Sequence, residues 1–316
     1  MNYKLPILSA VVLSLVVAAS VLGQLPQTSM GEKVKSPSST PSQVPEPSAA
    51  PPTVDGNDLV AQAAQKLWST PGIEAKARQS VDIFGQRLVG SGHYLQLPHP
   101  TSPMVRLDLK MQVGDGAITL QQISDGNTFW IRRDRPDGEG SLARVSLRRL
   151  RKVATQENQP TPPSMWLALG GLPKLMDSMV RYFDFGPAEP IIIRQLPLWK
   201  VEGVWKPNAL ARLLAGEDAE AEPVDLHDLP DQLPHGVTLI LGRDEVTPLF
   251  PYGVFYFREK QPELGGQGRA TRRGLVSLEL FEVRLRPDLR PRHFEYVPGD
   301  QEVEEKTEEY IARLRR

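Results

Sequence analysis

The stretch Val105-Arg106-Leu107-Asp108-Leu109-Lys110-Met111-Gln112-Val113 decides the fold of this chain. Its odd-numbered positions are all apolar, and its even-numbered positions are all charged or amide residues. Successive side chains of a β-strand point to opposite faces of a sheet, so this period of two predicts a strand with one buried face and one hydrated face. The rest of the chain must supply a cover for the buried face.

Two further strands follow after short turns. Gly114-Asp115-Gly116 and Asp125-Gly126-Asn127 are turn sequences, because glycine reaches positive φ without a steric cost. The first turn lies between 105–113 and 117–124, and the second lies between 117–124 and 128–133. β-Branched and aromatic residues in the last two segments favour strands. We therefore expect an antiparallel meander with a continuous apolar face.

Composition excludes several classes of protein. The 316 residues include 37 basic and 38 acidic side chains, which argues against a dedicated nucleic-acid binder with a basic surface. There is no cysteine, so a disulfide framework, a thiolate zinc site, a thiol nucleophile and a lipidated cysteine are all excluded. The glycine loop at 265–268 precedes a predicted strand, whereas a phosphate loop needs a helix next. We expect no cofactor.

The N-terminus indicates export. Residues 1–23 combine Lys4, an apolar core at 7–19 and small residues up to Gly23, as in a signal peptide. The alternative is an uncleaved anchor, because residues 5–25 carry no charge and roughly 20 apolar residues can span a bilayer. In either case we expect the protein in the periplasm or cell envelope, with membrane proximity if the segment is retained.

A linker follows at residues 24–57. It alternates proline with serine and contains few large apolar side chains, so it cannot bury enough surface to offset its ordering entropy. Fully extended, it would reach on the order of 100 Å at about 3.1 Å per residue. We expect residues 58–316 to form a single α+β domain.

Other segments have weaker patterns. We expect a helix that has Asp58 as its N-cap and runs to about Arg78 with a break at Pro71-Gly72, and a closing helix at 300–316. Strands are predicted at 81–89, 92–97, 183–185, 191–196, 199–205, 237–241, 253–258 and 274–285, and a short helix at 208–214. Residues 142–153 are basic and amphipathic, which indicates either a solvated face or a site for an anionic surface.

Residues 165–183 form a second apolar centre. Pro173 stands where the first turn of a helix needs no backbone N–H. The helix it begins is apolar on most of its circumference, so it must be covered on most sides or face a cavity. Its methionines make that surface adaptable.

Residues able to carry chemistry are scattered. The five histidines show no zinc spacing, and Ser91 in Gly90-Ser91-Gly92-His93 lacks the strand–elbow–helix context of a nucleophile. The acidic segment 217–231 indicates either a cation site or a solvated loop. The strand face with Trp199 and Trp205 is typical of core, with a ligand cavity as the alternative. We predict no catalytic residue and no metal site.

The order of parts resembles the LolA-like superfamily, the outer-membrane lipoprotein carriers and their relatives, and most closely the uncharacterised exported members of planctomycete-type bacteria. The resemblance spans about 58–316, and its motifs lie at 122–130, 170–176, 181–185 and 307–311.

This resemblance implies a strongly curved antiparallel sheet, an incomplete β-barrel with helices packed in its mouth. It also implies a cavity between the sheet and a lid helix that holds a lipid or the acyl chains of a lipoprotein. The residues that we expect to line this cavity are Leu107, Leu109, Met111, Trp130, Leu172, Met176, Met179 and Phe183.

Two other functions remain open. The chain could be a structural or interaction module, tethered by its linker to an envelope protein partner, with a cavity filled by its own side chains. An envelope hydrolase is the third alternative, which would need His93 or His227 to meet serine or aspartate partners in a cleft.

Overall fold

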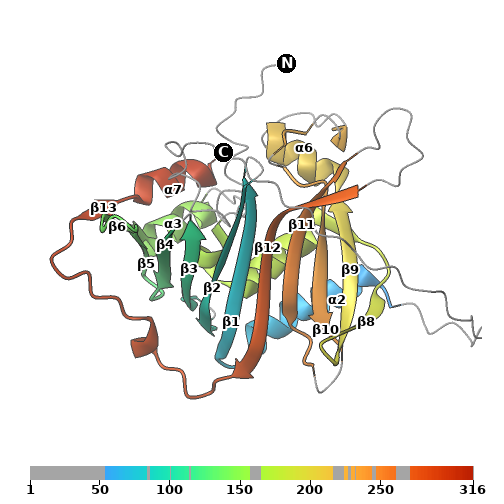
Figure 1. Ribbon diagram of the computed structural model, residues 1–316, viewed down its shortest axis with the longest axis horizontal. Helices are drawn as coiled ribbons and strands as arrows, with labels where there is room; N and C mark the ends of the chain where they lie inside the picture. The colour runs from blue at the N-terminus through green and yellow to red at the C-terminus, as the bar shows by residue number, and fades with distance from the viewer. Residues whose placement is uncertain are drawn as a thin grey trace, which may run out of the picture.

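The predicted meander lies within a single thirteen-stranded sheet in the computed structural model (Figure 1). The structure describes residues 54–83, 86–99, 101–113, 115–156, 165–215, 224–226, 229–231, 233–243, 247–260 and 271–315. The predicted export signal and almost all of the predicted linker lie outside these residues.

The strands follow one another along the sheet in the order β13-β6-β5-β4-β3-β2-β1-β12-β11-β10-β9-β7, and β8 pairs with β9. Neighbouring strands are antiparallel except for β13 and β6. The strands are β1 (Ile73–Ile83), β2 (Gln86–Leu97), β3 (Met104–Val113), β4 (Gly116–Ser124), β5 (Thr128–Asp134), β6 (Gly140–Ser146), β7 (Phe183–Phe185), β8 (Glu189–Ile193), β9 (Leu196–Trp205), β10 (Gly236–Gly242), β11 (Pro251–Lys260), β12 (Thr271–Leu285) and β13 (Val303–Glu305).

Six α-helices accompany the sheet in the described part of the chain: α2 (Gly56–Ser69), α3 (Leu147–Gln156), α4 (Trp166–Leu169), α5 (Leu172–Tyr182), α6 (Pro207–Ala215) and α7 (Thr307–Leu314). The sheet is curved and does not close into a barrel, and α2 passes behind its strands in Figure 1. The predicted fold class, a curved sheet with helices packed against it in an α+β arrangement, is confirmed. The parallel β13–β6 pair makes the sheet mixed rather than wholly antiparallel.

The alternation of residues 105–113 has the predicted consequence. Val105, Leu107 and Leu109 are buried in the main core, while Arg106 and Asp108 on the other face form an ion pair at 2.7 Å. The main core contains side chains from α2, α4 and α5 together with those of strands at both ends of the sheet. The helices are therefore the cover that the meander requires.

The predicted helix is wrong beyond Ser69. Helix α2 begins three residues earlier than expected, since its N-cap is Asp55, whose side chain accepts a hydrogen bond from the Asp58 N–H, and it ends before Pro71. From Ile73 the chain is strand β1, in which Ile73, Ala75 and Ala77 are buried at every second position. Small apolar residues in alternation suit a strand that runs close under a helix.

The predicted break at Gly90-Ser91-Gly92 is also wrong, because β2 runs through it without interruption and the reversal lies between β1 and β2. A Cβ at Gly92 would lie 1.8 Å from the Asp108 carbonyl oxygen of β3. This glycine therefore serves a close approach of two backbones rather than a turn. The closing helix is shorter than predicted, since Val303–Glu305 forms β13 before α7 begins.

The basic segment at 142–153 divides into β6 and α3. Leu147 and Leu150 are fully buried, and Arg149 on α3 forms an ion pair with Glu308 of α7. The hydrophobic side of α3 therefore belongs to the core, and the hydrophilic side is solvated and paired.

A smaller apolar cluster lies on the opposite face of the sheet. It contains Ile123, Leu289 and Phe294, and Trp130 and Tyr296 pack against it with ring centroids 5.3 Å apart. The segment after β12, including the short 3₁₀ helix η4 (Pro291–Phe294), covers this patch. Within the described residues, no helix is both long enough and apolar enough to cross a membrane.

Candidate ligand-binding interior

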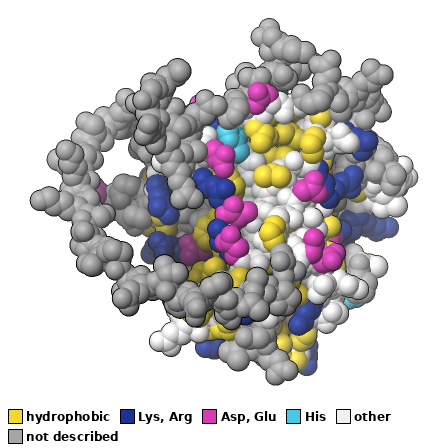
Figure 2. Space-filling view, turned by 90° about the vertical axis from the view of Figure 1, so that its right-hand side faces the viewer, with side chains coloured by type: hydrophobic (Ala, Val, Ile, Leu, Met, Phe, Trp, Pro, Cys, Tyr) yellow, Lys and Arg dark blue, Asp and Glu magenta, His cyan; other side chains and the backbone are white. Residues whose placement is uncertain are grey.

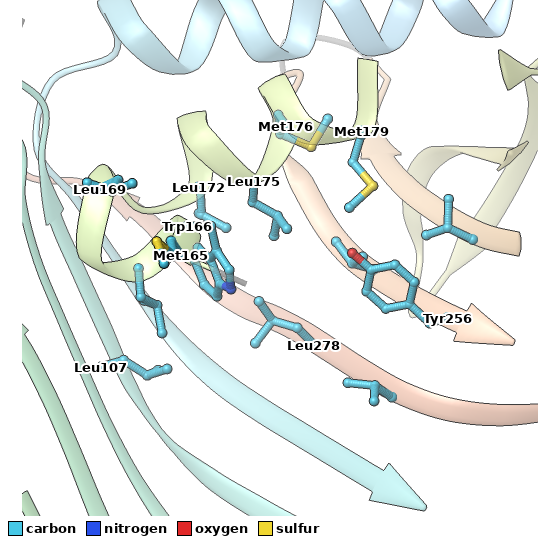
Figure 3. Close-up of a cluster of buried hydrophobic side chains, with 14 of the residues drawn as sticks. Leu107, Met165, Trp166, Leu169, Leu172, Leu175, Met176, Met179, Tyr256 and Leu278 are labelled. Atoms are coloured by element: carbon cyan, nitrogen blue, oxygen red, sulfur yellow. The ribbon is translucent and has the colours of Figure 1, made fainter. Parts of the chain in front are cut away.

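Residues 165–182, called the plug below, lie between α2 and the concave face of the sheet (Figure 3). The plug consists of Met165, helix α4, the reversal Gly170-Gly171 and helix α5. On the outer side, Trp68 of α2 donates from Nε1 to Asp177 Oδ1 at 3.3 Å, and the Lys174 ammonium lies 5.3 Å from the Trp68 ring centroid. On the inner side, the plug presents apolar side chains to the strands.

Residues three or four apart share a face of a helix, and the two opposite faces of α5 differ in chemistry. Leu172, Leu175, Met176 and Met179 form the buried stripe and are at most 1% exposed. A surface pocket of about 410 Å³ lies on the opposite stripe, lined by Lys174, Asp177, Ser178 and Arg181. The helix is therefore amphipathic, and its pocket lies outside the apolar interior.

The structure brings together six of the eight residues predicted to line a cavity. They belong to the main core, where each is at most 3% exposed: Leu107, Leu109, Leu172, Met176, Met179 and Phe183. Figure 3 shows Met179 pointing from α5 towards the strand that carries Tyr256. These six are therefore part of one buried core, and their role in lining a ligand cavity stays a prediction.

The other two lie elsewhere. Met111 forms a small separate cluster with Ile118, and Trp130 lies on the convex face against Tyr296. Side chains alternate between the two faces of a strand, which explains the position of Trp130, because its neighbours Phe129 and Ile131 point into the main core. Trp130 therefore does not share a face with Leu107 and Leu109.

The interior is filled by the protein's own side chains. Met165 is 2% exposed, Trp166 1%, and Met176 and Met179 0%. On the other side of α5, the Phe183 ring lies with its centroid 4.3 Å from that of Trp205, whose Nε1 donates to the Pro234 carbonyl at 2.8 Å. The structure thus shows a closed, packed arrangement of sheet and plug.

One polar cluster interrupts this apolar contact at the reversal of the plug. The Leu172 N–H lies 3.0 Å from the Tyr94 hydroxyl oxygen and 3.1 Å from Gln96 Oε1, and the Tyr94 hydroxyl donates to Gln96 Oε1 at 2.5 Å. Tyr94 and Gln96 both come from the inward face of β2 and are at most 1% exposed. Burial raises the pKa of Tyr94 above its usual range, so the hydroxyl stays protonated and able to donate.

The reversal is possible because Gly170 and Gly171 have φ of 158° and 70°. A Cβ on Gly171 would lie 2.5 Å from the Tyr94 hydroxyl and 2.8 Å from Gln96 Oε1. Glycine therefore lets the first N–H of α5 reach β2 directly. We call Tyr94, Gln96 and the Leu172 N–H the latch.

Two buried donors beside this region have no acceptor in the part of the chain that the structure describes. They are Gln96 Nε2 and Trp166 Nε1. Figure 3 shows the Trp166 side chain below α5 and next to Leu278, and its ring stacks on that of Tyr94 with centroids 6.5 Å apart. An unpaired buried donor costs about 1–3 kcal/mol. The closed state thus retains unused hydrogen-bonding capacity in its interior.

Sequence reasoning missed the latch. Residues 92–97 were predicted to be a strand, but the inward position of Gln96 depends on its parity with Tyr94. An amide at an otherwise apolar strand position was the available signal. Its partner is a backbone N–H 76 residues away, which no local pattern indicates.

The predicted aromatic face of β9 divides between core and surface. Val201 and Trp205 are buried in the main core, whereas Trp199 is half-buried under the Arg243 guanidinium, 4.8 Å from its ring centroid. The expectation of core is therefore correct for Trp205. Trp199 lies at the border of the surface.

The residues considered for other chemistry do not converge. Ser91 and His93 are exposed on β2, and Asp108, paired with His93 in register, accepts hydrogen bonds from Arg106 and Gln121. His227 and most of the acidic segment 217–231 lie outside the described residues, and Arg258 holds the carbonyls of Leu229 and Pro230 at the end of this segment. Among the described residues, no group of three potential ligands could hold a metal ion.

The chain has similarities to solved structures, although no protein-family model and no curated protein matches it. A DUF1329 family protein from Desulfovibrio piger is 11% identical, with 76% of this chain and 96% of the other covered and a TM-score of 0.32. LprF from Mycobacterium bovis is 10% identical, with 72% and 91% covered and a TM-score of 0.36. A putative outer membrane lipoprotein-sorting protein domain from Vibrio parahaemolyticus is 10% identical, with 75% and 94% covered and a TM-score of 0.30.

The unclosed curved sheet with helices packed against it is the arrangement that the resemblance to the LolA-like superfamily implies. The further resemblance to planctomycete-type members stays a prediction, and function must be argued from the residues of this chain.

Proposed function

We propose that this protein is an exported cell-envelope binding protein that holds a lipid or acylated ligand between its curved sheet and the plug. The observation that carries the proposal is the inner surface of the plug. Met165, Met176 and Met179, all at most 2% exposed, face the strands across an apolar contact that is joined to β2 at the latch. Unbranched methionine side chains repack readily around different apolar shapes.

Ligand entry would exchange one apolar contact for another. When the plug moves away from the sheet, the exposed surface costs about 25 cal/mol per Å², and an acyl chain that fills the same space restores a similar amount. The latch adds roughly 1 kcal/mol for each hydrogen bond that opens. The closed state is therefore a self-filled form from which a ligand displaces the plug.

The two unpaired donors support a ligand with a polar end. Gln96 Nε2 and Trp166 Nε1 lack acceptors in the closed state. An ester or amide carbonyl beside an acyl chain would supply such an acceptor, so binding would remove a cost that the empty protein bears.

The direct test is native mass spectrometry of the protein purified from its own membranes, together with uptake of a fluorescent fatty-acid probe. We expect bound lipid in the mass spectrum and saturable probe uptake. Repeated recovery without lipid, combined with no uptake of the probe, would contradict the proposal.

A pair of tyrosine variants sharpens this test. Tyr94→Phe removes the latch hydroxyl and keeps the ring against Trp166, and about 1 kcal/mol for one hydrogen bond corresponds to roughly fivefold faster uptake. Tyr256→Phe is the control, because Tyr256 is also buried in the main core but lies on β11 and takes no part in the latch. Equal uptake rates for the two variants would remove the latch from the mechanism.

A second candidate is a structural or interaction module that binds an envelope protein and no small ligand. The fully packed interior favours it, because the protein's own side chains already fill the space. The candidates separate on one measurement, since the module predicts no uptake of the fatty-acid probe in either the parent or the Tyr94→Phe variant.

The proposal includes no enzymatic reaction. In support, Ser91 and His93 lie exposed on an open strand face, and the Asp108 carboxylate is already bonded to Arg106 and Gln121. A location in the periplasm or cell envelope, close to a membrane if the N-terminal apolar segment is retained, is part of the same proposal.

A further inference from the structure

The hairpin formed by β8 and the start of β9 exposes an unusual amount of apolar surface. The side chains of Ile192, Ile193 and Leu196 are 74%, 42% and 38% exposed. They are three of the six large hydrophobic residues that stand exposed in the described part of the chain. Their concentration at one hairpin end indicates a contact surface.

The exposure is on both faces of the hairpin. Ile192 and Ile193 are consecutive strand residues, so their side chains point to opposite sides, and both are exposed. A folded partner that packs on the hairpin would cover one side and leave the other in water. A lipid phase surrounds an inserted hairpin on every side, so this arrangement fits a membrane better than a flat protein surface.

Addition of a partner strand is also poorly supported. Strand β8 has only five residues, and Pro190 provides no N–H for a ladder. Short edge strands with proline are among the devices that discourage pairing with another chain. The hairpin is therefore not built as a template for a second copy.

Cationic and aromatic groups accompany the apolar residues. Arg194 is exposed in the turn, where it and Gln195 have φ of 49° and 68°, and no carboxylate among the described residues forms an ion pair with it. At the base, the Arg243 guanidinium lies over the half-buried Trp199 ring. Tryptophan and arginine are the residues that suit the headgroup layer, with guanidinium groups binding lipid phosphates. Figure 2 views the molecule from the β8–β9 side, where hydrophobic side chains lie among basic and acidic ones.

The chain enters the fold at the foot of the same hairpin. Val54 forms a β-bridge with Ala188, whose N–H donates to the Val54 carbonyl at 2.9 Å, one residue before β8 begins. The 53 residues that precede Val54 include the apolar segment 7–19. The N-terminal connection and the apolar hairpin therefore share one edge of the sheet.

We propose that the β8–β9 hairpin is a membrane-docking element that inserts Ile192, Ile193 and Leu196 into the interfacial layer of a phospholipid bilayer. Arg194 and Arg243 bind lipid phosphates, and Trp199 lies at the headgroup level. This site is separate from the interior under the plug, so it does not depend on whether an acyl ligand binds there.

The absence of cysteine allows a site-specific test on the full chain. Ile192→Cys, labelled with an environment-sensitive fluorophore, is compared with Val297→Cys, because Val297 is 84% exposed in the segment after η4 and far along the chain from the hairpin. Both proteins are reconstituted with vesicles of phosphatidylethanolamine and phosphatidylglycerol that carry nitroxide lipids. We expect a blue shift and strong quenching at position 192, and water-like emission without quenching at position 297.

Three outcomes would overturn the docking proposal. They are water-like emission at both positions, equal quenching at both, and a blue shift at position 192 that lacks nitroxide quenching and so reports a protein contact.

An Arg194→Gln change in the labelled Ile192→Cys protein provides a second measure. One basic residue near an anionic surface contributes about 1 kcal/mol, so we expect roughly fivefold weaker insertion. Unchanged insertion would contradict the contact between Arg194 and a lipid phosphate. Because the hairpin is separate from the interior under the plug, we expect fatty-acid uptake at the parental level in every hairpin variant.

Discussion

The apolar residues on the two faces of the sheet are covered from water in different ways. The concave face is covered by the plug, which lies between the strands and α2 and is joined to β2 by the latch. The convex face is mostly polar and carries one small apolar cluster around Phe294, which the segment after β12 covers. A helical layer with its own reversal can move as a unit, whereas the convex cover is a short extension of a strand. If the proposed function is correct, the concave side is where a ligand would exchange with the plug.

The largest expected effect concerns the reversal of the plug. Gly171→Ala places a Cβ 2.5 Å from the Tyr94 hydroxyl at a φ of 70°, so overpacking and backbone strain add together. We expect a loss of about 4 kcal/mol in the free energy of unfolding, measured by urea denaturation. Gly138→Ala is the matched control, since Gly138 has a φ of 85° and nothing within 4 Å of the added Cβ. Its loss should be about 1 kcal/mol, and equal losses would contradict the tight contact.

A second effect compares two methionines. Met176→Ala opens a cavity under the plug and should lower the free energy of unfolding by about 3 kcal/mol. The space it leaves should also increase fatty-acid uptake. Met111→Ala removes the same side chain from a small cluster with Ile118 and should cost about 1–2 kcal/mol. If both variants take up the probe equally, the interior under the plug is not the binding space.

A third, smaller effect tests the convex face. Trp130→Ala should lower the free energy of unfolding by about 2 kcal/mol, because a half-buried aromatic ring against Tyr296 is lost. Fatty-acid affinity should stay at the parental value, since Trp130 lies across the sheet from the plug. A fall in affinity would return Trp130 to the ligand-binding residues, as the sequence had suggested.

The smallest effect concerns the surface charges at the β9 end of the sheet. Hydrogen bonds from Arg272 and Lys200 lower the pKa of Glu202 to about 2. A carboxyl group with a lowered pKa in the folded state stabilises the protein above its ordinary pKa and loses this contribution as the pH falls. The free energy of unfolding should therefore decrease as the pH is lowered from 5 to 2. The decrease should be at most about 1 kcal/mol, because the group is partly exposed. Glu202→Gln should reduce this pH dependence of stability. If stability depends on pH in the same way in the variant, the interactions of Glu202 with Arg272 and Lys200 are not its source.

Local patterns predicted some parts of this protein well and others poorly. The meander and the Pro173 helix follow the sequence closely, because alternation and a proline in the first helical turn are local signals. Residues 73–78 were assigned to a helix, since buried alanines suit either structure until a sheet neighbour is known. Gly90-Ser91-Gly92 suggested a break between two strands, although β2 is continuous there and Gly92 lies against the Asp108 carbonyl.

The sequence by itself determined that a one-sided sheet needs an apolar cover and that residues 165–183 contain one. The alternation of Leu107 and Leu109 and the methionines of α5 are sufficient for this inference. Only the tertiary structure decided that Trp130 faces away from the plug and that the Leu172 N–H meets Tyr94 and Gln96. The reason is physical: strand parity assigns each side chain to a face, but register and contacts across 76 or more residues depend on how the whole sheet curves around its helices.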